Sequence, residues 1–234
     1  MTDLELNTIL SERLKAVRTR IAAAEQRTGR EPNEVTLVAI TKTVSTRVAR
    51  LLPELGMLDL GESRPQELWR KAEALPGIPI RWHLIGHLQR NKVERTLPLV
   101  HLIHSIDSAR LLDEVENQAL KQNLQPQLLL QINASQEEQK HGLEAVELHT
   151  ILSQLKSMSA RIVGLMGMAA LSSDPEQARP TFRTLKELLE QHRARNVELT
   201  ELSMGMSGDY EVAIEEGATL VRVGSTLFEG LEAE

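Results

Sequence analysis

Eight short apolar segments alternate with longer amphipathic segments, and this alternation limits the possible folds more than any other feature of the chain. The first segment, residues 35–43, is a β-branched apolar run without polar alternation, which is typical of a parallel strand covered by helices. The other predicted strands are 57–60, 78–85, 102–106, 127–133, 162–166, 198–204 and 219–223. The predicted helices are 46–52, 66–74, 87–97, 109–123, 146–155, 175–195 and 210–217.

The alternation predicts an α/β fold, a (β/α)8 TIM barrel, because eight strand–helix units in 234 residues match its typical size of about 250 residues. No linker divides the chain, so we expect one domain over residues 1–234. An open doubly wound sheet is the alternative, but no Gly-x-Gly-x-x-Gly follows the first strand. Pro180 is expected to kink the seventh helix or to split off its first turn.

An additional helix is predicted before the first strand, over residues 6–24. An apolar residue recurs there every three or four positions, and the resulting stripe consists of Leu6, Leu10, Leu14, Val17, Ile21 and Ala24. We expect this helix to cover the bottom of the barrel or to pack on its side. The stripe is interpreted as core packing and not as a dimer seam, so a monomer is expected.

Composition excludes several classes of protein. The net charge is −6 with acidic and basic residues interspersed, and aromatic residues make up only 2%, which argues against a nucleic-acid binder. The absence of cysteine removes disulfides, thiolate nucleophiles and cysteine-based metal sites. The acidic N-terminus lacks the apolar core of a signal peptide, and no stretch approaches the roughly 18 apolar residues of a membrane span. We therefore expect a cytoplasmic protein without membrane or nucleic-acid partners.

The residues at the carboxyl ends of the predicted strands include a lysine, an arginine and several hydrogen-bonding groups, and this is the edge at which barrels of this kind bind ligands. These residues are Lys42, Glu62, His83, Asp107, Asn133, Met166, Ser207 and Arg222. Closure of the barrel puts the first strand beside the eighth, so Lys42 and Arg222 can face one bound molecule. A lysine desolvated near a guanidinium becomes a better amine nucleophile. The alternative is a lysine whose stem packs on the rim while its ammonium stays in water.

The loops after the seventh and eighth strands occupy the usual phosphate site of such barrels. Backbone amides freed by Gly205, Gly208 and Gly224, together with the hydroxyls of Ser207 and Ser225, can cradle a phosphate dianion. The alternative is that these glycines are simple turn residues. An amine beside a phosphate cradle indicates a Schiff base with a phosphorylated carbonyl compound, either pyridoxal phosphate or a sugar phosphate in an aldolase.

Nine segments carry a family resemblance across the whole chain. They are Val-Ala-Ile-Thr-Lys-Thr at 38–43, Gly-Glu-Ser-Arg-Pro-Gln-Glu at 61–67, Trp-His-Leu-Ile-Gly-His-Leu-Gln-Arg-Asn-Lys at 82–92, His-Ser-Ile-Asp at 104–107, Gln-Ile-Asn at 131–133, Lys-His-Gly at 140–142, Gly-Leu-Met-Gly-Met-Ala at 164–169, Leu-Ser-Met-Gly-Met-Ser at 202–207 and Val-Arg-Val-Gly-Ser at 221–225. In this order they resemble the pyridoxal phosphate homeostasis protein family, single-domain relatives of the alanine racemase barrel.

The resemblance implies that Lys42 carries pyridoxal 5′-phosphate as a Schiff base and that Arg222 meets the pyridine nitrogen. It implies that Ser207, Gly224 and Ser225 hold the phosphate. The residues that would line the ring are Ser63, His83 and Met166. The chain departs from the family at Val44-Ser45, where Lys-Pro is usual, and at Ser63-Arg64, where Asn-Tyr is usual.

The resemblance further implies buffering of the cofactor and its delivery to pyridoxal-phosphate-dependent apoenzymes. A guanidinium only donates hydrogen bonds, so a pyridine nitrogen facing Arg222 stays unprotonated and the ring is a weaker electron sink. Racemases of the related fold bring a catalytic tyrosine from a second domain, whereas Tyr210, the only tyrosine here, is predicted beside the phosphate loop. We therefore predict no catalytic residue, with an amino-acid racemase as the main alternative and a Schiff-base aldolase as a weaker one.

A metal site is not predicted. His83 and His87 are four residues apart, but Gly86 and the end of a strand between them argue against helical ligand geometry.

Overall fold

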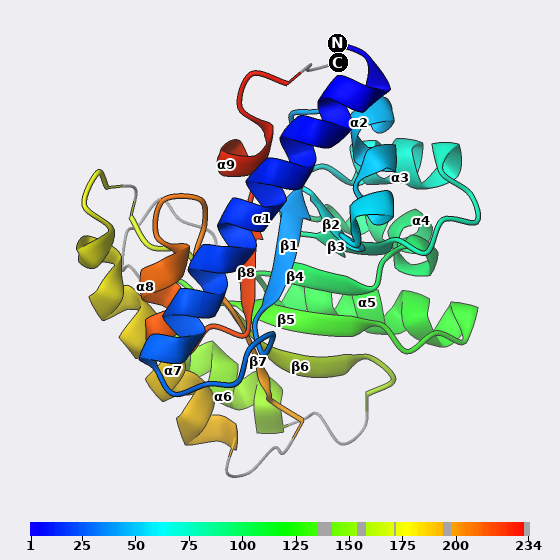
Figure 1. Ribbon diagram of the computed structural model, residues 1–234. Coiled ribbons are helices and arrows are strands. Elements are labelled where there is room, and N and C mark those ends of the chain that lie inside the picture. The colour runs from blue at the N-terminus through cyan, green and yellow to red at the C-terminus, as the bar shows by residue number, and fades with distance from the viewer. Residues whose placement is uncertain (135–141, 154–157, 171, 194–197, 232–234) are drawn as a thin grey trace.

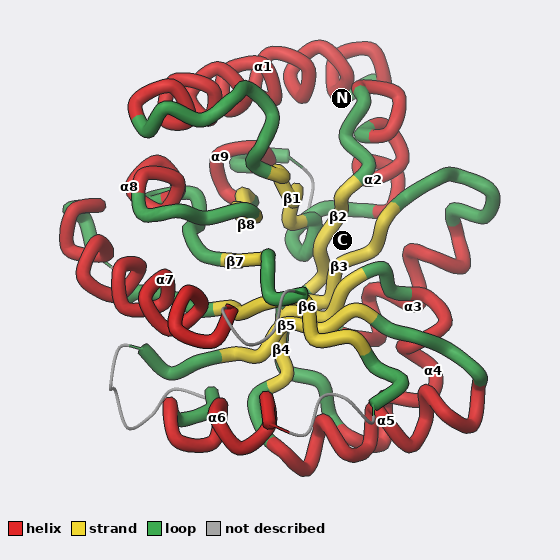
Figure 2. Tube along the Cα trace, turned by 90° about the horizontal axis from the view of Figure 1, so that it is seen from below, coloured by secondary structure: helices red, strands yellow, loops and turns green. Residues whose placement is uncertain are grey.

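The computed structural model is a closed barrel of eight parallel strands surrounded by helices (Figures 1 and 2). The strands are β1 (Thr36–Ile40), β2 (Asp59–Glu62), β3 (Arg81–Leu84), β4 (Leu102–Ile106), β5 (Gln127–Gln131), β6 (Arg161–Met166), β7 (Glu201–Ser203) and β8 (Leu220–Val223). Each strand pairs with the next along the chain, and β8 closes the barrel against β1. The predicted (β/α)8 TIM barrel with an extra N-terminal helix is confirmed.

Helices follow the strands on the outside of the barrel (Figure 2). They are α1 (Asp3–Arg27), α2 (Thr46–Leu51), α3 (Pro65–Ala74), α4 (Val93–Thr96), α5 (Ala109–Gln122), α6 (Ala145–Ser153), α7 (Arg179–Arg193), α8 (Tyr210–Glu215) and α9 (Ser225–Phe228). Short 3-10 helices are η1 (Pro53–Leu55), η2 (Arg90–Lys92), η3 (Leu97–Leu99) and η5 (Pro175–Ala178). The structure describes residues 1–134, 142–153, 158–170, 172–193 and 198–231.

Several element boundaries differ from the sequence prediction. The strands are shorter than the apolar runs because buried residues continue beyond the strand ends into the loops. For this reason β1 ends two residues before Lys42. The helix predicted at 87–97 begins only with η2 and α4, because the chain first crosses the barrel mouth at Gly86, where a Cβ would lie 2.1 Å from the Ser63 carbonyl oxygen.

The predicted interruption near Pro180 is confirmed, since η5 precedes α7 as a separate turn. Residues 154–155, at the end of the helix predicted at 146–155, and residues 194–195, at the end of the helix predicted at 175–195, lie outside the described residues.

The apolar core has two parts, because successive strand residues point alternately into the barrel and toward the helices. The smaller part fills the barrel interior and contains Val38, Ile40, Leu102, Leu129, Val163, Met166 and Leu220. The larger part lies between the strands and the helices and includes the outward-facing Leu37, Ala39, Leu128 and Leu130. Polar side chains share the barrel interior with the smaller cluster, and His83, His104, Ser203 and Arg222 are all buried.

Helix α1 lies on the side of the barrel, across α8 and α9 and beside α2 (Figures 1 and 2). All six residues of the predicted apolar stripe are buried against the barrel, which confirms that the stripe packs into the core of this chain. Although α1 has 25 residues, neither it nor any other helix in the described ranges is long and apolar enough to cross a membrane.

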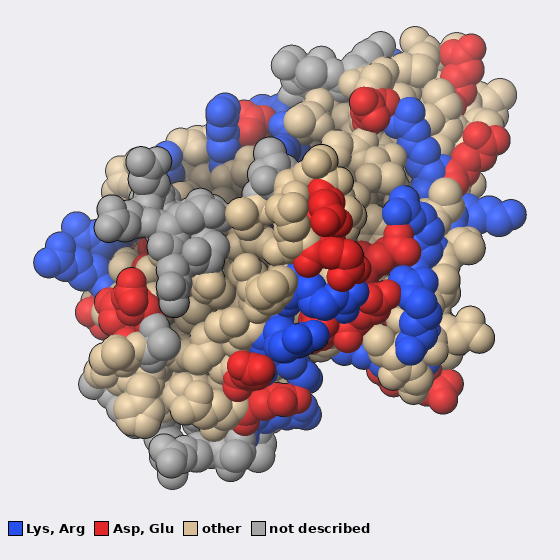
Figure 3. Space-filling model, turned by 90° about the vertical axis from the view of Figure 1, so that its left-hand side faces the viewer, with Lys and Arg blue, Asp and Glu red and all other residues tan. Residues whose placement is uncertain are grey.

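Ion pairs connect α1 and α7 to α8 and to the residue that follows it. Glu211 on α8 pairs with Arg20 and Arg27 on α1, and Arg179 on α7 pairs with Glu215 on α8 and with Glu216. Figure 3 shows acidic and basic side chains intermingled in a band across this face of the molecule. Arg20, Arg27 and Arg179 each have a carboxylate within 3.5 Å, so these three charges are neutralised by Glu211, Glu215 and Glu216.

Candidate ligand site

A pocket of about 790 Å³ opens at the carboxyl ends of the strands. It brings together six of the eight residues that the sequence assigned to one site, namely Lys42, Ser63, Ser207, Arg222, Gly224 and Ser225. Lys42 and Arg222 meet there because β1 pairs with β8, with Val38 opposite Arg222 in the register. The predicted juxtaposition of the lysine and the arginine is therefore confirmed.

His83 and Met166 do not line this pocket. Both side chains are buried in the barrel interior, and Ile85 and Met168, two residues further along, line the pocket instead. Side chains on one face of a strand recur every second residue, so a shift of two moves the contact up by about 6.6 Å without changing the face. His83 and Met166, which the family resemblance assigns to the ring, therefore lie one interior layer below the residues that line the pocket.

Lys42 is a solvent-exposed side chain on the loop after β1. The expectation of a desolvated lysine was therefore wrong, because β1 ends at Ile40 and the following turn lifts Lys42 to the rim of the barrel. An exposed amine remains accessible to a ligand that enters from the open mouth. Val44 is buried in the core and the Ser45 hydroxyl caps α2 by accepting a hydrogen bond from the Val48 amide, so both departures at this loop have structural roles.

A buried ion pair holds the loop that carries Lys42. The ammonium of Lys71 donates to the carbonyl oxygens of Thr41 (2.7 Å) and Val44 (2.8 Å) and to Glu62 Oε1 (2.7 Å), which uses all three of its protons. The Thr41 hydroxyl also donates to Glu62 Oε1 at 2.6 Å. The backbone on both sides of Lys42 is therefore tied to α3 and to the end of β2. Sequence analysis found Glu62 at the strand end but missed Lys71, whose helical position carries no local signal.

The loops after β7 and β8 converge on one hydroxyl. Ser207 Oγ accepts hydrogen bonds from the backbone amides of Gly224 (3.1 Å) and Thr226 (3.5 Å). Gly205 makes this approach feasible: its φ is +88°, and a Cβ there would lie 2.5 Å from the Ala213 Cβ. These hydrogen bonds bring the Ser207 hydroxyl and the backbone of Gly224 together among the residues that line the pocket, and donors of these kinds are the ones that bind anions in proteins.

Asp209 also lines the pocket, and its carboxylate accepts a 2.6 Å hydrogen bond from the Met206 amide. Burial raises the pKa of Asp209, although the Met206 hydrogen bond and the charge of Arg222 act in the opposite direction.

Arg222 is buried at the base of the pocket. Its Nη1 donates to Ser203 Oγ at 2.6 Å and its Nη2 donates to the Gly167 carbonyl oxygen at 3.0 Å. Burial lowers the pKa of Arg222 to about 10, opposed by the charge of Asp209, so the guanidinium is still protonated at neutral pH. Two of its five N–H groups are used in this way, and within the described residues the others have no acceptor.

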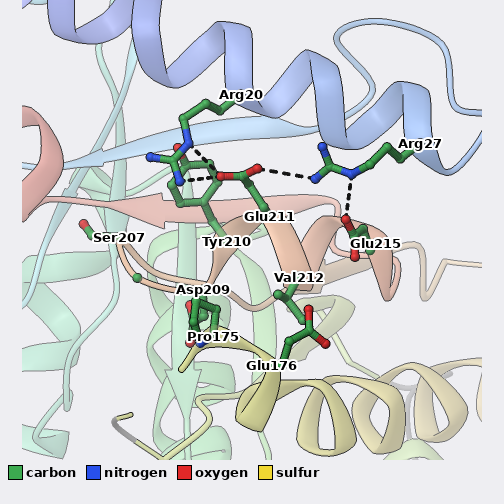
Figure 4. Close-up of a pocket in the computed structure, with 11 residues that line it drawn as sticks. Arg20, Arg27, Pro175, Glu176, Ser207, Asp209, Tyr210, Glu211, Val212 and Glu215 are labelled. Atoms are coloured by element: carbon green, nitrogen blue, oxygen red, sulfur yellow. Dashed lines mark hydrogen bonds and ion pairs between the residues drawn. The ribbon is translucent and has the colours of Figure 1, made fainter. Parts of the chain in front are cut away.

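A second pocket of about 260 Å³ lies behind the loop that contains Ser207 (Figure 4). Its guanidinium groups, Arg20 and Arg27, point at Glu211 and Glu215 and are already paired with them. Tyr210 lines this second pocket and not the larger one, and its buried hydroxyl has no hydrogen-bond partner among the described residues. The neutralised charges make this pocket a poor site for an anionic ligand.

Asp107, another of the residues at the predicted strand ends, forms a side-chain contact with His87. Its carboxylate lies 2.9 Å from His87 Nδ1, which links the loop after β3 to the end of β4. No group of three or more metal-ligating side chains that could hold an ion occurs in the part of the chain that the structure describes.

The fold and the pocket define a class of protein, a (β/α)8 barrel with a lysine, a buried arginine and an anion cradle at one mouth. The family model described as "Alanine racemase, N-terminal domain" matches residues 13–232. The chain is also 43% identical over 219 residues to the pyridoxal phosphate homeostasis protein of Aquifex aeolicus, which covers 93% of this chain and 96% of that protein. The protein belongs to the pyridoxal phosphate homeostasis protein family within this class of barrels.

Two further relatives agree with this assignment. The pyridoxal phosphate homeostasis protein of Synechocystis is 40% identical over 200 residues, covering 84% of this chain and 92% of the relative. The structure of PipY from Synechococcus elongatus with pyridoxal phosphate (PLP) bound has a TM-score of 0.82 and 31% identity, covering 94% of this chain and 99% of PipY. The two curated relatives are named as homeostasis proteins and not as enzymes.

Proposed function

We propose that this protein binds pyridoxal 5′-phosphate as a Schiff base on Lys42 and contributes to homeostasis of the cofactor in the cytoplasm, by buffering it and delivering it to apoenzymes. The proposal rests on the convergence of an accessible amine, a buried guanidinium and a hydroxyl–amide cradle in one pocket. The names of the relatives and the pyridoxal phosphate in the PipY structure support the same ligand.

The donor set suits the chemically different ends of the cofactor. Ser207, Gly224 and Ser225 would hold the phosphate, since all three line the pocket, and the Gly224 amide would exchange its hydrogen bond to Ser207 Oγ for one to the ligand. The guanidinium of Arg222 only donates, which suits an unprotonated pyridine nitrogen. When bound, the cofactor supplies an aldehyde that condenses with the amine of Lys42 and releases water. Ile85 and Met168 would line the ring in place of His83 and Met166.

A binding role is favoured over racemisation by the position of Tyr210. A racemase needs a proton-transferring group on the face of the substrate opposite the lysine. Tyr210 is the only tyrosine in the sequence, and it lines the smaller pocket behind the Ser207 loop. Its hydroxyl is buried there and is not directed at the site that contains Lys42.

The test is a titration of the purified protein with pyridoxal phosphate, followed by the visible absorption band of the Schiff base. Lys42→Ala should abolish the band while the circular dichroism spectrum stays unchanged. Lys15→Ala, which removes an exposed lysine on α1, is the matched control and should retain the band. A band that survives in Lys42→Ala, or is missing from the unmodified protein, would refute the proposal.

Two assays separate carriage from catalysis. When the loaded protein is mixed with a pyridoxal-phosphate-dependent apoenzyme, the activity of that enzyme should return, as delivery of the cofactor requires. Incubation with L-amino acids followed by chiral analysis should show no sustained production of D-isomers, and such production would establish the racemase alternative.

A further inference from the structure

Five buried side chains form a continuous chain of hydrogen bonds through the barrel interior. In order they are Asp59, His83, His104, Ser203 and Arg222, and we call them the interior relay. The successive distances are 3.1 Å from Asp59 Oδ1 to His83 Nε2, 2.9 Å from His83 Nδ1 to His104 Nε2, 2.9 Å from His104 Nδ1 to Ser203 Oγ and 2.6 Å from Ser203 Oγ to Arg222 Nη1. Only Arg222 of these five lines the large pocket.

The relay joins strands that are not neighbours in the sheet. His104 lies on β4 and Ser203 on β7, so the hydrogen bond between them crosses the barrel interior. The lower end of the relay is anchored at the start of β2 and β3, where Arg81 donates through both Nε and Nη2 to the carboxylate of Asp59. The relay therefore runs from the bottom of the barrel to the base of the proposed cofactor site.

The two ends of the relay determine the direction of every hydrogen bond between them. Arg222 has no acceptor atom, so Ser203 Oγ must accept from it. At the other end, burial raises the pKa of Asp59, but hydrogen bonds from Arg81 and His83 outweigh this effect and bring the pKa to about 2. Asp59 is therefore an ionised acceptor at neutral pH, and His83 Nε2 must donate to it.

The tautomers of both histidines follow from these ends. Because His83 donates through Nε2, its Nδ1 accepts from the Nε2–H of His104, and His104 Nδ1 then accepts from the Ser203 hydroxyl. Burial, together with the charge of Arg222, holds the pKa of His104 well below its ordinary value, in agreement with a neutral ring. With both rings neutral, each member of the relay donates toward Asp59.

We propose that the interior relay positions the guanidinium of Arg222 for the cofactor, with Asp59, His83, His104 and Ser203 as positioning residues. The inference rests on the proposed binding of pyridoxal phosphate. Arg222 is a buried cation with no carboxylate paired to it among the described residues, so its orientation depends on Ser203 and on the Gly167 carbonyl. The Ser203 hydroxyl stays available as an acceptor because His104 holds its proton on the other side.

Polarisation along the relay adds to this positioning. The ionised carboxylate of Asp59 attracts the proton of each donor in turn, which makes Ser203 Oγ a better acceptor for the guanidinium than an isolated hydroxyl. Nη1 and Nη2 are each held by one bond, and the remaining N–H groups belong to a guanidinium that lines the pocket. A residue at the bottom of the barrel is thereby coupled to the pyridine end of the site.

The first test concerns the relay alone and needs no cofactor. Long-range ¹H–¹⁵N NMR of the full chain, labelled at histidine and free of pyridoxal phosphate, reports which ring nitrogen carries the proton. We expect both His83 and His104 to be neutral Nε2–H tautomers at pH 7. An Nδ1–H tautomer or a charged ring at His104 would overturn the donor order and with it the proposal.

The second test measures cofactor retention. Ser203→Ala should raise the dissociation constant for pyridoxal phosphate about tenfold, because it removes a hydrogen bond to a charged group. His104→Phe should have a similar effect from a position that does not line the pocket. The double variant should stay near tenfold instead of a hundredfold, since both changes break the same link.

Two controls keep the result interpretable. Ser203→Thr keeps a hydroxyl and should bind within about threefold of the unmodified protein. Val163→Ala removes two methyl groups from the same barrel interior and leaves every member of the relay in place, and its affinity should not change. Unchanged affinity in Ser203→Ala, or an equal loss in Val163→Ala, would overturn the positioning role. If the unmodified protein fails to bind pyridoxal phosphate, the proposed function fails, whereas the NMR result still decides whether the relay exists.

Discussion

The buried imidazole of His104 should make the stability of this protein depend on pH in a way that one substitution removes. In the folded state the pKa of His104 lies well below its ordinary value of 6.5, because burial disfavours the charged ring. In the unfolded chain the ring regains its ordinary pKa and binds a proton below pH 6.5. A group with a depressed folded pKa contributes its full stability above the unfolded pKa and loses it as the pH falls.

The magnitude follows from proton binding to the unfolded chain. At pH 5.5 this binding stabilises the unfolded state by about 1.4 kcal/mol, and at pH 7.5 by only about 0.1 kcal/mol. His104→Gln removes the titrating ring, while its amide can still donate where Nε2–H donated to His83. At pH 7.5 the variant should be less stable by about 1–3 kcal/mol, because the Ser203 hydroxyl loses its acceptor. This difference should shrink by roughly 1.3 kcal/mol at pH 5.5.

The assay is urea unfolding of the cofactor-free protein at several pH values between 5.5 and 7.5, monitored by circular dichroism. All other titrating groups are common to both proteins, so the difference in unfolding free energy isolates His104. Leu129→Ala, an apolar truncation in the same barrel interior, is the control, and its difference should not vary with pH. A His104→Gln difference that is constant or grows as the pH falls would refute the assignment of a neutral buried ring.

Two further substitutions test the packing around the site. Lys71→Met should cost about 3–5 kcal/mol of unfolding free energy, because it leaves the Glu62 carboxylate buried without its cation. Adding Glu62→Leu to this variant should restore part of the lost stability. If the losses of the two single variants simply add in the double variant, the ion pair does not stabilise the fold. Gly164→Ala should cost about 3 kcal/mol, because its Cβ would lie 1.8 Å from the Glu201 carbonyl oxygen, whereas Gly208→Ala, which meets nothing within 4 Å, should change stability by less than about 1 kcal/mol. Equal effects at the two glycines in thermal or urea unfolding would contradict the steric argument.

The face of each strand was predictable, but the height of each side chain within the barrel was not. Alternation along a strand is a local property, and His83 and Met166 lie on the same face of their segments as Ile85 and Met168. Their distance from the mouth depends on where each strand begins and on the shear of the closed sheet, which are set by pairing with neighbours. For this reason Ile85 and Met168 line the pocket instead.

Long-range partners were likewise beyond local inference. Nothing in the residues around His104 indicates that it meets Ser203, which is 99 positions away in the sequence. The polar residues embedded in apolar strands were nevertheless a usable signal, because a buried imidazole or hydroxyl requires a hydrogen-bond partner. That signal predicts a network in the lumen without naming its members.

The sequence by itself determined the strand–helix rhythm, the barrel, the stripe of α1 and the placement of Lys42, Arg222 and the Ser207 and Gly224 loops at one mouth. These features follow from hydrophobic periodicity and from the closure of parallel strands, which need no atomic detail. Only the tertiary structure decided that Lys42 is exposed, that Lys71 holds its loop and that the relay reaches Arg222. Burial and hydrogen-bond partners depend on distances across the barrel, and those are set by the packing of the whole chain.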